Sequence, residues 1–502
     1  MKRRSTKLNV LFSILLQISL ILNGLVVPRI ILKDFGSEVN GLITSLNQFL
    51  NYISLLEGGV SGVAMASLYR PLAEKDWQKV SSIYAAFNSF FRNIGRIYIF
   101  YALAVAAIYP LVVNTGFHYG YIFSMTMILA MTLLNQYFFS LSYRVLLNAD
   151  RQVFFTSLVQ IIVVALNLTV VVILHLMGQG VHVIKLAGGL VMLVQPLLFY
   201  RYAQKCYDLD RNAVPDKDAL KQRWDGFGQN LAFYIHSNTD VILLTLFSTL
   251  SNVSVYAVYM LAGNAIRGFL DGIAAGFNPA LGNALVIEPK EKVNSRLDKY
   301  EFTIFFAASY LFTNAIILIR PFVSLYTRGI LDAEYDQPVF GFIIMLAMAI
   351  YCLRAPYVGT VFAAGHFRRT NRIAFTEAAL NLGISLLLIR NFGLIGIAIG
   401  TLVSVSYRLA AHIEYLRKNI LQRSPMRFIG IFLLFFGTGA ICIFTFRILL
   451  PEAMYAPNWI SWLRTAVLSC AYTGIWFLAA GGFHIRIRGG RKKTIRKRGH
   501  EE

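Results

Sequence analysis

Ionisable and amide side chains occur inside several long apolar runs of this sequence, where they could bind or move charged groups. Glu57 lies in the run 39–70, which is long and apolar enough to cross a bilayer as a helix. Asn47, Gln48 and Asn51 precede it at three- and four-residue spacing, which places them on one face of that helix. A carboxylate near the centre of a span costs about 2.5–3.5 kcal/mol on insertion scales, so by default it faces a protein interior or a wet cavity. We expect this helix to line a path through the membrane.

A second apolar run, 254–287, has a comparable polar face, which carries Asn264, Arg267, Asp271 and Asn278. Arg267 and Asp271 are four residues apart, so they can pair along the helix. Asp271 also stands 214 residues after Glu57. The two acids are candidates for ion coupling, and the two polar faces are candidates for substrate binding. The alternative is a neutralised lock between helices, which would only hold the structure together.

Three arginines complete the candidate substrate site. Arg29 follows a helix break that we predict at Gly24 and Pro28, because proline removes a backbone hydrogen bond. Arg92 and Arg96 are four residues apart in the cytoplasmic half of an expected span. They could receive an anionic headgroup, or they could extend to the lipid headgroups as ordinary interfacial arginines.

Two further acids lie in apolar runs. Asp240 is near His236 in the run 227–249, and the pair could carry a proton, although a lone histidine in a helix is more often a packing residue. Asp240 is therefore a third candidate for ion coupling. Glu377 opens the run 373–390, and we expect it to cap that helix or to pair with Arg372.

No catalytic or metal-binding pattern is present in the sequence. It contains no glycine-rich phosphate loop ahead of a lysine, no HExxH and no GxSxG, and its eight histidines are dispersed. The four cysteines are scattered, and none has CxxC spacing. We therefore expect no enzymatic activity, no cofactor and no metal.

The composition indicates an integral membrane protein. The chain has 502 residues, of which 57% are hydrophobic and only 14% charged, and apolar runs of about twenty residues or more recur along it. We expect an all-α protein of fourteen spans: 9–32, 41–69, 83–113, 121–146, 154–176, 183–203, 227–249, 254–287, 300–325, 339–363, 373–390, 394–416, 428–450 and 459–481.

The net charge of +22 is concentrated in alternate loops. This is the positive-inside pattern, which places the basic loops and both termini in the cytoplasm. The charge therefore reflects topology and contact with anionic membrane lipids, rather than binding to nucleic acid.

Short matches at an offset of about 214 residues indicate an internal duplication. FGSEV at 35–39 precedes one expected span as TLSNV at 249–253 precedes another, and ALNL occurs at both 165–168 and 379–382. We predict an N-terminal lobe at 1–214 and a C-terminal lobe at 215–428, each of six helices. Two additional helices at 429–482 and a basic cytoplasmic tail at 483–502 would follow. Six is an even number, so the lobes would share one orientation, with a substrate site at their interface.

The segments DFGSEVNGL (34–42), LLEGGV (55–60) and LYRPL (68–72), with the opening helix, resemble the start of bacterial polysaccharide transporters. These are the O-antigen flippase branch of the multidrug/oligosaccharidyl-lipid/polysaccharide (MOP) exporter superfamily. The resemblance implies two V-shaped six-helix lobes around a cavity that opens alternately to either side. Cavity walls from the first, second, seventh and eighth spans would carry Arg29, Glu57, Asp240, Arg267 and Asp271.

The function that this resemblance implies is the flipping of a polyprenyl-pyrophosphate-linked oligosaccharide, a precursor of cell-surface polysaccharide. The protein would lie in the bacterial cytoplasmic (inner) membrane, use an H⁺ or Na⁺ gradient, and work beside glycan biosynthesis proteins. Alternatives are a cation-coupled exporter of amphiphilic drugs, a membrane glycan polymerase, and a scaffold that binds the precursor without moving it.

Overall fold

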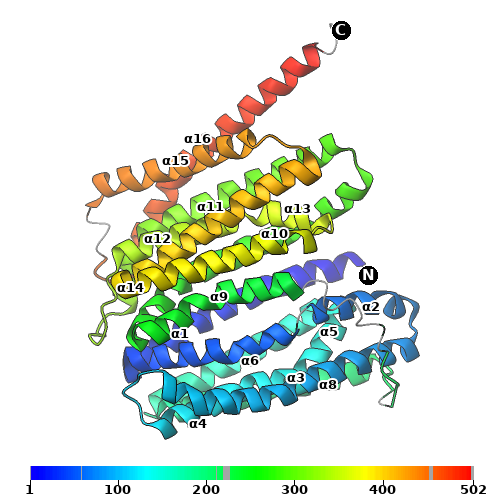
Figure 1. Cartoon of the computed structure of the whole chain (residues 1–502), viewed down its shortest axis with the longest axis vertical. Coiled ribbons are helices and arrows are strands. Elements are labelled where there is room, and N and C mark those ends of the chain that lie inside the picture. The colour runs from blue at the N-terminus through cyan, green and yellow to red at the C-terminus, as the bar shows by residue number, and fades with distance from the viewer. Residues whose placement is uncertain are drawn as a thin grey trace. The chain divides into compact units, whose positions relative to one another are not determined.

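The structure is a computed structural model that describes residues 2–57, 59–210, 212–216, 218, 227–451 and 456–498. All regular elements within these residues are helices, which confirms the predicted all-α class (Figure 1). The chain forms two compact units. The first contains Met1–Ala257 and Ile330–Ala333, and the second contains Val258–Gly329 and Glu334–Glu502.

The first unit is built from helices joined by short turns. They are α1 (Lys2–Asn51), the 3-10 helix η1 (Tyr52–Glu57), α2 (Val60–Glu74), α3 (Trp77–Val112), α4 (Tyr119–Asn135), the π-helix η2 (Gln136–Ser140), α5 (Leu141–Ala149), α6 (Val153–Leu176), α7 (Val181–Val191), α8 (Val194–Cys206), α9 (Phe227–Phe247) and the start of α10 (Leu250–Ile287). Helix α1 packs along α6 and against α9, and α3 packs along α4. Their apolar cores hold fully buried side chains such as Phe87, Phe91 and Leu46.

Helix α1 contains one residue outside helical geometry, Gly36, with φ +84° and ψ 175°. This backbone region is open only to glycine. The chain restarts its helix at Ser37, where the Asp332 carboxylate accepts hydrogen bonds from both the backbone N–H and the Oγ of Ser37, each at 2.6 Å. The predicted break at Gly24 and Pro28 is therefore wrong, because α1 continues through Pro28 and bends at Gly36.

We expect Gly36→Ala to destabilise the protein by about 1–3 kcal/mol, because the new side chain would be forced into a glycine-only conformation. A Cβ at this position would also lie 2.7 Å from the Asp332 carboxylate oxygen. The measurement is the midpoint of thermal unfolding of the purified protein in detergent. Gly62→Ala in α2 is the matched control, because a Cβ there has no heavy atom within 4 Å. An equal midpoint for the two variants would contradict this account of the kink.

The predicted continuous helix over 41–69 is interrupted. Helix α1 ends at Asn51, η1 covers Tyr52–Glu57, and α2 begins at Val60. Gly58, within this interruption, lies outside the described residues. Glu57 therefore ends a 3-10 segment instead of lying in the middle of an α-helix.

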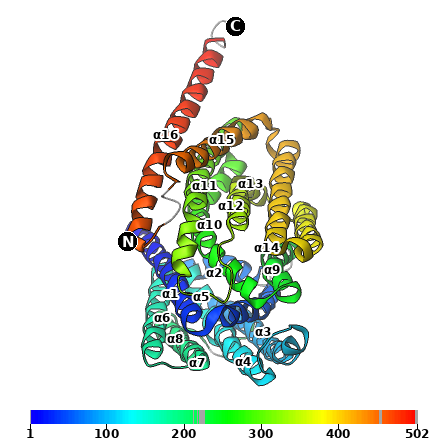
Figure 2. The same cartoon turned by 90° about the vertical axis from the view of Figure 1, so that its left-hand side faces the viewer.

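The second unit contains the rest of α10 and the helices that follow it. They are α11 (Lys290–Tyr326), α12 (Pro338–Leu353), α13 (Ala355–Ala363), the 3-10 helix η4 (Arg368–Thr370), α14 (Asn371–Leu416), the π-helix η5 (Arg417–Leu421), α15 (Met426–Leu449) and α16 (Trp459–Arg498). Helix α11 is the most enclosed, and it contacts α12, α15 and α16. Figure 2 shows α15 and α16 beside α11.

Helix α14 holds two predicted spans, because it is a hairpin. Gly393 has φ +50° and ψ −124°, and the two arms approach closely on either side of it. A Cβ at Gly400 would lie 2.1 Å from the Ser385 Oγ. Asn381 Nδ2 donates to Thr401 Oγ1 between the arms at 3.1 Å. Small residues that let helices approach, and amides that bond across them, are typical of membrane helix pairs.

Helix α16, the second of the two additional helices, is attached to α11 through a buried amide. Ser469 Oγ donates to Asn314 Oδ1 at 2.6 Å, and Asn314 Nδ2 donates to Thr473 Oγ1 at 2.9 Å. Aromatic rings of α11, α15 and α16 pack around this contact, with the Phe306, Phe435 and Phe477 centroids about 6 Å apart.

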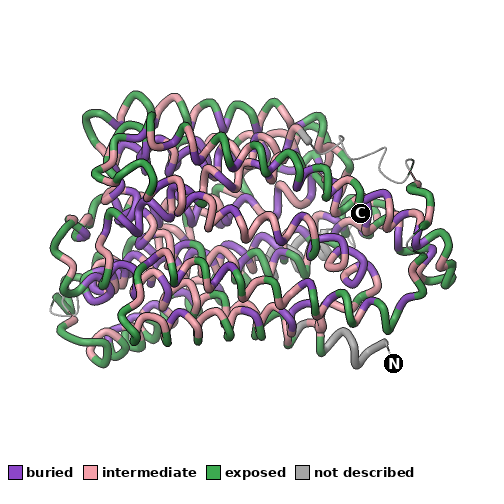
Figure 3. The backbone as a smooth tube through the Cα atoms, turned by 90° about the horizontal axis from the view of Figure 1, so that it is seen from below, coloured by how far each residue is buried: buried purple, intermediate pink, exposed green. Residues whose placement is uncertain are grey.

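Eleven described helices are long and apolar enough to cross a membrane, by length and composition. The difference from the predicted fourteen has physical causes. Helices α1 and α14 each run through a glycine kink, and α9, which holds several buried polar residues, is not among the eleven. Many large apolar side chains are exposed along these helices, as expected of lipid-facing surfaces (Figure 3). The chain is a multi-pass membrane protein.

The division into units differs from the predicted lobes, because α9 belongs to the first unit. The predicted boundary at 214 and 215 concerns a repeat along the chain, and it stays a prediction. The predicted tail is helical to Arg498, and its last four residues lie outside the described residues.

Candidate functional site

Two irregular helical segments of the first unit meet at Glu57. The 3-10 helix η1 ends with Glu57, and the π-helix η2 carries Tyr137, whose ring is fully buried. The Tyr137 hydroxyl donates a 2.6 Å hydrogen bond to Glu57 Oε1, and it lies 3.4 Å from the Ser54 hydroxyl. Single-turn π-helices occur frequently at functional sites. The interruption of the predicted helix thus directs the carboxylate into the interior of its own unit.

Charged and aromatic groups surround this carboxylate. Arg144 in α5 and Tyr234 in α9 are both close enough to interact electrostatically with Glu57. Arg144 is half-buried, and so is Glu57. A proton or cation that reached this carboxylate would compete with the tyrosine donor and the nearby arginine, because each of these neighbours interacts with its charged form.

The polar face that precedes Glu57 on α1 is mostly used for packing. Gln48 Nε2 donates to Asn238 Oδ1 of α9, and the Ser45 and Thr245 hydroxyls are 2.7 Å apart. Asn40 Nδ2 donates to Ser254 Oγ at 2.8 Å. These contacts match the alternative of an interhelical lock, so the face is not lined wholly by free polar groups.

Two candidate residues of this face remain accessible within the first unit. Asn47 is exposed and Asn51 is half-buried. The first unit also places Arg29 half-buried on α1, whereas Arg92 and Arg96 are exposed on α3. Arg96 Nη1 donates to Asn93 Oδ1 one turn earlier, at 3.0 Å.

Asp240 is buried in α9, where it accepts a 3.0 Å hydrogen bond from the Tyr256 hydroxyl. His236 is buried one turn earlier. The Asp240 carboxylate is directed to the Tyr256 hydroxyl.

In the second unit, α10 has the predicted ion pair. Arg267 Nε lies 3.5 Å from Asp271 Oδ2, and the Asp271 side chain is 59% exposed. Asn264 and Asn278 are exposed on the same helix, and Asn278 Oδ1 accepts a 3.2 Å hydrogen bond from the Tyr300 hydroxyl. The Asp271 environment thus differs from that of Glu57, which is half-buried against a tyrosine.

A network of buried charged side chains lies near this ion pair. Arg354, between α12 and α13, donates from Nη1 to Glu377 Oε1 at 2.7 Å. Arg408, on the other arm of the α14 hairpin, donates to Glu377 Oε2. Glu377 is fully buried, and both arginine side chains are less than 10% exposed. The expected pairing of Glu377 with Arg372 is wrong, because the carboxylate turns into the helix bundle instead of towards the surface.

Tyr351 connects the ion pair to the buried network. The guanidinium carbon of Arg267 lies 4.2 Å from the Tyr351 ring centroid, and that of Arg354 lies 3.6 Å from it. Both distances are within the range of cation–π attraction. Exposed Asp271 is therefore linked through Arg267, the tyrosine ring and Arg354 to the buried carboxylate of Glu377.

Several residues of this arrangement were not predicted from the sequence as site residues. Arg354, Arg408 and Glu377 are ionisable residues inside apolar runs. That pattern could have predicted a buried ion triad, because charges within spans usually pair with one another. Tyr137 and Tyr351 gave no such signal, because tyrosine is common in apolar helices and only the tertiary structure brings these two rings to charged groups.

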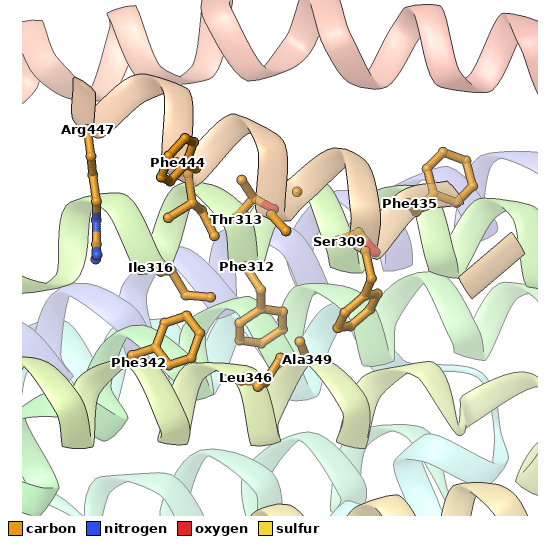
Figure 4. A pocket seen from close by; sticks show the side chains of 14 residues that line it. Ser309, Phe312, Thr313, Ile316, Phe342, Leu346, Ala349, Phe435, Phe444 and Arg447 are labelled. Carbon is orange, nitrogen blue, oxygen red and sulfur yellow. The ribbon is translucent and has the colours of Figure 1, made fainter. Parts of the chain in front are cut away.

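A separate cavity of about 280 Å³ lies between α11, α12 and α15. Its walls are almost wholly apolar, with Phe312, Phe342 and Phe444 among the lining side chains and Arg447 at one end (Figure 4). None of the candidate charged residues lines it. This cavity can take an apolar chain, and it has no group that could bind an ion at its centre.

No family model and no curated protein matches the sequence. Solved structures do match the fold. The lipid II flippase MurJ, in an inward closed conformation, superposes with a TM-score of 0.69 and 14% sequence identity, over 95% of this chain and 99% of that one.

Drug transporters also match. A multidrug resistance MATE family transporter of the MOP superfamily, in an outward-facing conformation, gives a TM-score of 0.57 and 16% identity, over 85% of this chain and 96% of that one. A Vibrio cholerae MATE transporter superposes with a TM-score of 0.59 and 14% sequence identity, over 84% of this chain and 99% of that one. The narrower assignment to the O-antigen flippase branch stays a prediction. The chain has the fold that these transporters share, and a lipid II flippase and MATE family transporters are among its structural neighbours.

Proposed function

We propose that the protein is a flippase that moves a polyprenyl-pyrophosphate-linked oligosaccharide across the bacterial cytoplasmic membrane by alternating access. The observation that carries the proposal is the extent of the match to the lipid II flippase. It covers 95% of this chain, whereas the drug transporters cited above cover 84–85% of it while matching nearly all of their own length. The additional length of this chain that matches the flippase favours a lipid-linked substrate over a small drug.

The charges of α10 suit a phosphate-bearing headgroup. Arg267 is held between Asp271 and the Tyr351 ring, so its guanidinium is oriented before a substrate arrives. Guanidinium groups bind phosphate through two parallel hydrogen bonds. Arg92 and Arg96 are exposed on α3 and are further candidates for phosphate contact. In this mechanism the polyprenyl tail stays in lipid while the sugars move with the headgroup.

Ion coupling is proposed for the carboxylates outside the buried triad. Glu57 accepts one tyrosine hydrogen bond, Asp240 accepts another, and Asp271 is exposed beside Arg267. An arriving H⁺ or Na⁺ would change the net charge at these groups. Glu377 is a poor candidate, because two buried arginines already bind both of its carboxylate oxygens.

Deletion of the gene tests the biological role. A flippase for surface glycan precursors predicts loss of surface polysaccharide and accumulation of the lipid-linked precursor inside the cell, with both restored by the intact gene. Unchanged surface polysaccharide would contradict the proposal.

The second candidate is a cation-coupled drug exporter, which the MATE structural neighbours favour. It predicts that overexpression raises resistance to cationic dyes and leaves surface glycans unchanged. Partner proteins of glycan biosynthesis belong only to the flippase proposal, and association with them in pull-downs would favour it.

A further inference from the structure

A second cavity of about 580 Å³ lies within the second unit, between the end of α10 and the start of α11. Its size falls in the range of ordinary ligand pockets, about 300–1,000 Å³. One wall is apolar and comes from α10, with Phe277, Ala280 and Leu281. The Phe277 ring stacks on the buried Tyr300 ring at 4.7 Å and 5°, so this wall is held rigidly.

The opposite wall is basic and comes from one face of α11. Lys292, Arg296 and Lys299 line the cavity at spacings of four and three residues, which places them above one another on the helix. Lys292 and Lys299 are both exposed. Three cations on one helix face, opposite an apolar wall, form a site with one charged side and one apolar side.

One carboxylate offsets part of this charge. Arg296 donates two hydrogen bonds to Glu288, at 2.8 and 2.5 Å. These bonds lower the pKa of Glu288 below its ordinary value, so the carboxylate stays ionised near neutral pH. Three cations and one anion leave two net positive charges in the cavity, and the lysines supply them.

Two exposed apolar residues at the end of α10 precede the cavity lining. Val286 and Ile287 come immediately before Glu288, which lines the cavity, and they are 84% and 73% exposed. In a membrane protein such side chains can contact lipid. The cations of the cavity are therefore close in the chain to a surface that suits lipid.

We propose that this cavity binds a phosphate group carried on a lipid, with Lys292 and Lys299 as the charge partners and the Phe277 wall against the first part of the lipid chain. The positive-inside pattern predicts that this site lies at the cytoplasmic surface. Two lipids have this chemistry there, the pyrophosphate-linked precursor and a bulk anionic phospholipid. Binding of the precursor rests on the proposed function, whereas binding of a bulk phospholipid does not.

Equilibrium binding of radiolabelled farnesyl diphosphate tests the site. The full-length protein is placed in nanodiscs of phosphatidylcholine, which is zwitterionic, so no other lipid in the assay carries a net negative charge. We expect the Lys292→Gln/Lys299→Gln variant to bind about tenfold more weakly, because two charge-assisted contacts are lost. We expect Gly276→Leu to weaken binding as well, since Gly276 lines the cavity and a Cβ there has no heavy atom within 4 Å, so the side chain would fill the space.

Two matched variants control for charge and for helix packing. Lys290→Gln removes a cation from the same helix outside the cavity lining, and Gly430→Leu adds a side chain to open space on α15. Both should bind farnesyl diphosphate like the unmodified protein. Equal affinity of the double lysine variant and the unmodified protein would overturn the proposal, as would equal weakening by Lys290→Gln. Inorganic pyrophosphate binding as tightly as farnesyl diphosphate would overturn the lipid-borne assignment.

Nanodiscs that contain phosphatidylglycerol distinguish the two sources. Displacement of farnesyl diphosphate by phosphatidylglycerol supports the site and assigns it to bulk anionic lipid. Retained binding supports the site and assigns it to the precursor. Lysine-dependent binding in a protein that fails to flip the precursor would overturn the proposed function and leave this site intact.

Discussion

Glu377→Gln is expected to destabilise the protein by about 3–5 kcal/mol, the usual cost of breaking a buried ion pair. The carboxylate is fully buried and accepts hydrogen bonds from Arg354 and Arg408. Removing its charge would leave two positive guanidiniums close together in an apolar helix bundle. The α14 hairpin and the break between α12 and α13 would both lose their shared contact.

The measurement is the thermal unfolding midpoint and the monodisperse yield of the purified variant in detergent. Glu414→Gln is the matched control, because Glu414 lies on the same helix and pairs with Arg417 and Lys418 at the surface. Surface pairs contribute little, so this control should unfold at the same temperature as the unmodified protein.

A second variant separates charge from packing. Glu377→Gln combined with Arg408→Met removes one of the two buried guanidiniums, so it should unfold at a higher temperature than Glu377→Gln alone. An unchanged midpoint for Glu377→Gln, or no recovery in the combined variant, would contradict the account of this triad.

Glu57→Gln together with Asp271→Asn is expected to abolish gradient-driven transport in proteoliposomes, while the protein remains folded. Neither acid belongs to the buried triad: Glu57 accepts a hydrogen bond from Tyr137, and Asp271 lies beside Arg267. The amides keep the size of the side chains and remove the charge that would respond to an H⁺ or Na⁺. The two residues lie in different units.

The assay compares substrate movement with and without an imposed H⁺ or Na⁺ gradient. Glu74→Gln is the control, because Glu74 is an exposed acid that pairs with Arg70 on the surface of α2. It should transport like the unmodified protein. Undiminished gradient-driven transport by the double variant would remove the coupling role of both acids.

The fold class could be predicted because membrane helices are specified by local composition. Apolar runs and basic loops located most of the spans, and the ion pair of Arg267 with Asp271 followed from helical spacing alone. The helix irregularities could not be predicted in this way. The bend at Gly36, rather than at Pro28, depends on Asp332, which is almost 300 residues away in the chain.

The candidate site was predicted only in part for the same reason. Glu57 was identified as an unusual charge, but its partner Tyr137 is brought to it by a π-helix that leaves no mark in the apolar pattern. Glu377 was assigned to a neighbouring arginine in sequence, whereas its actual partners come from α12 and from the second arm of α14. Contacts between distant helices decide where an intramembrane charge points.

The central claim is tested most directly by leaflet translocation in liposomes. The purified protein is reconstituted with a fluorescent polyprenyl-pyrophosphate-linked oligosaccharide confined to one leaflet, and a membrane-impermeant reagent reports the sugars that reach the other. The flippase account predicts time-dependent transfer that is accelerated by an ion gradient and absent from protein-free liposomes. Transfer no faster than in protein-free liposomes, with a gradient present and the protein folded, would contradict it.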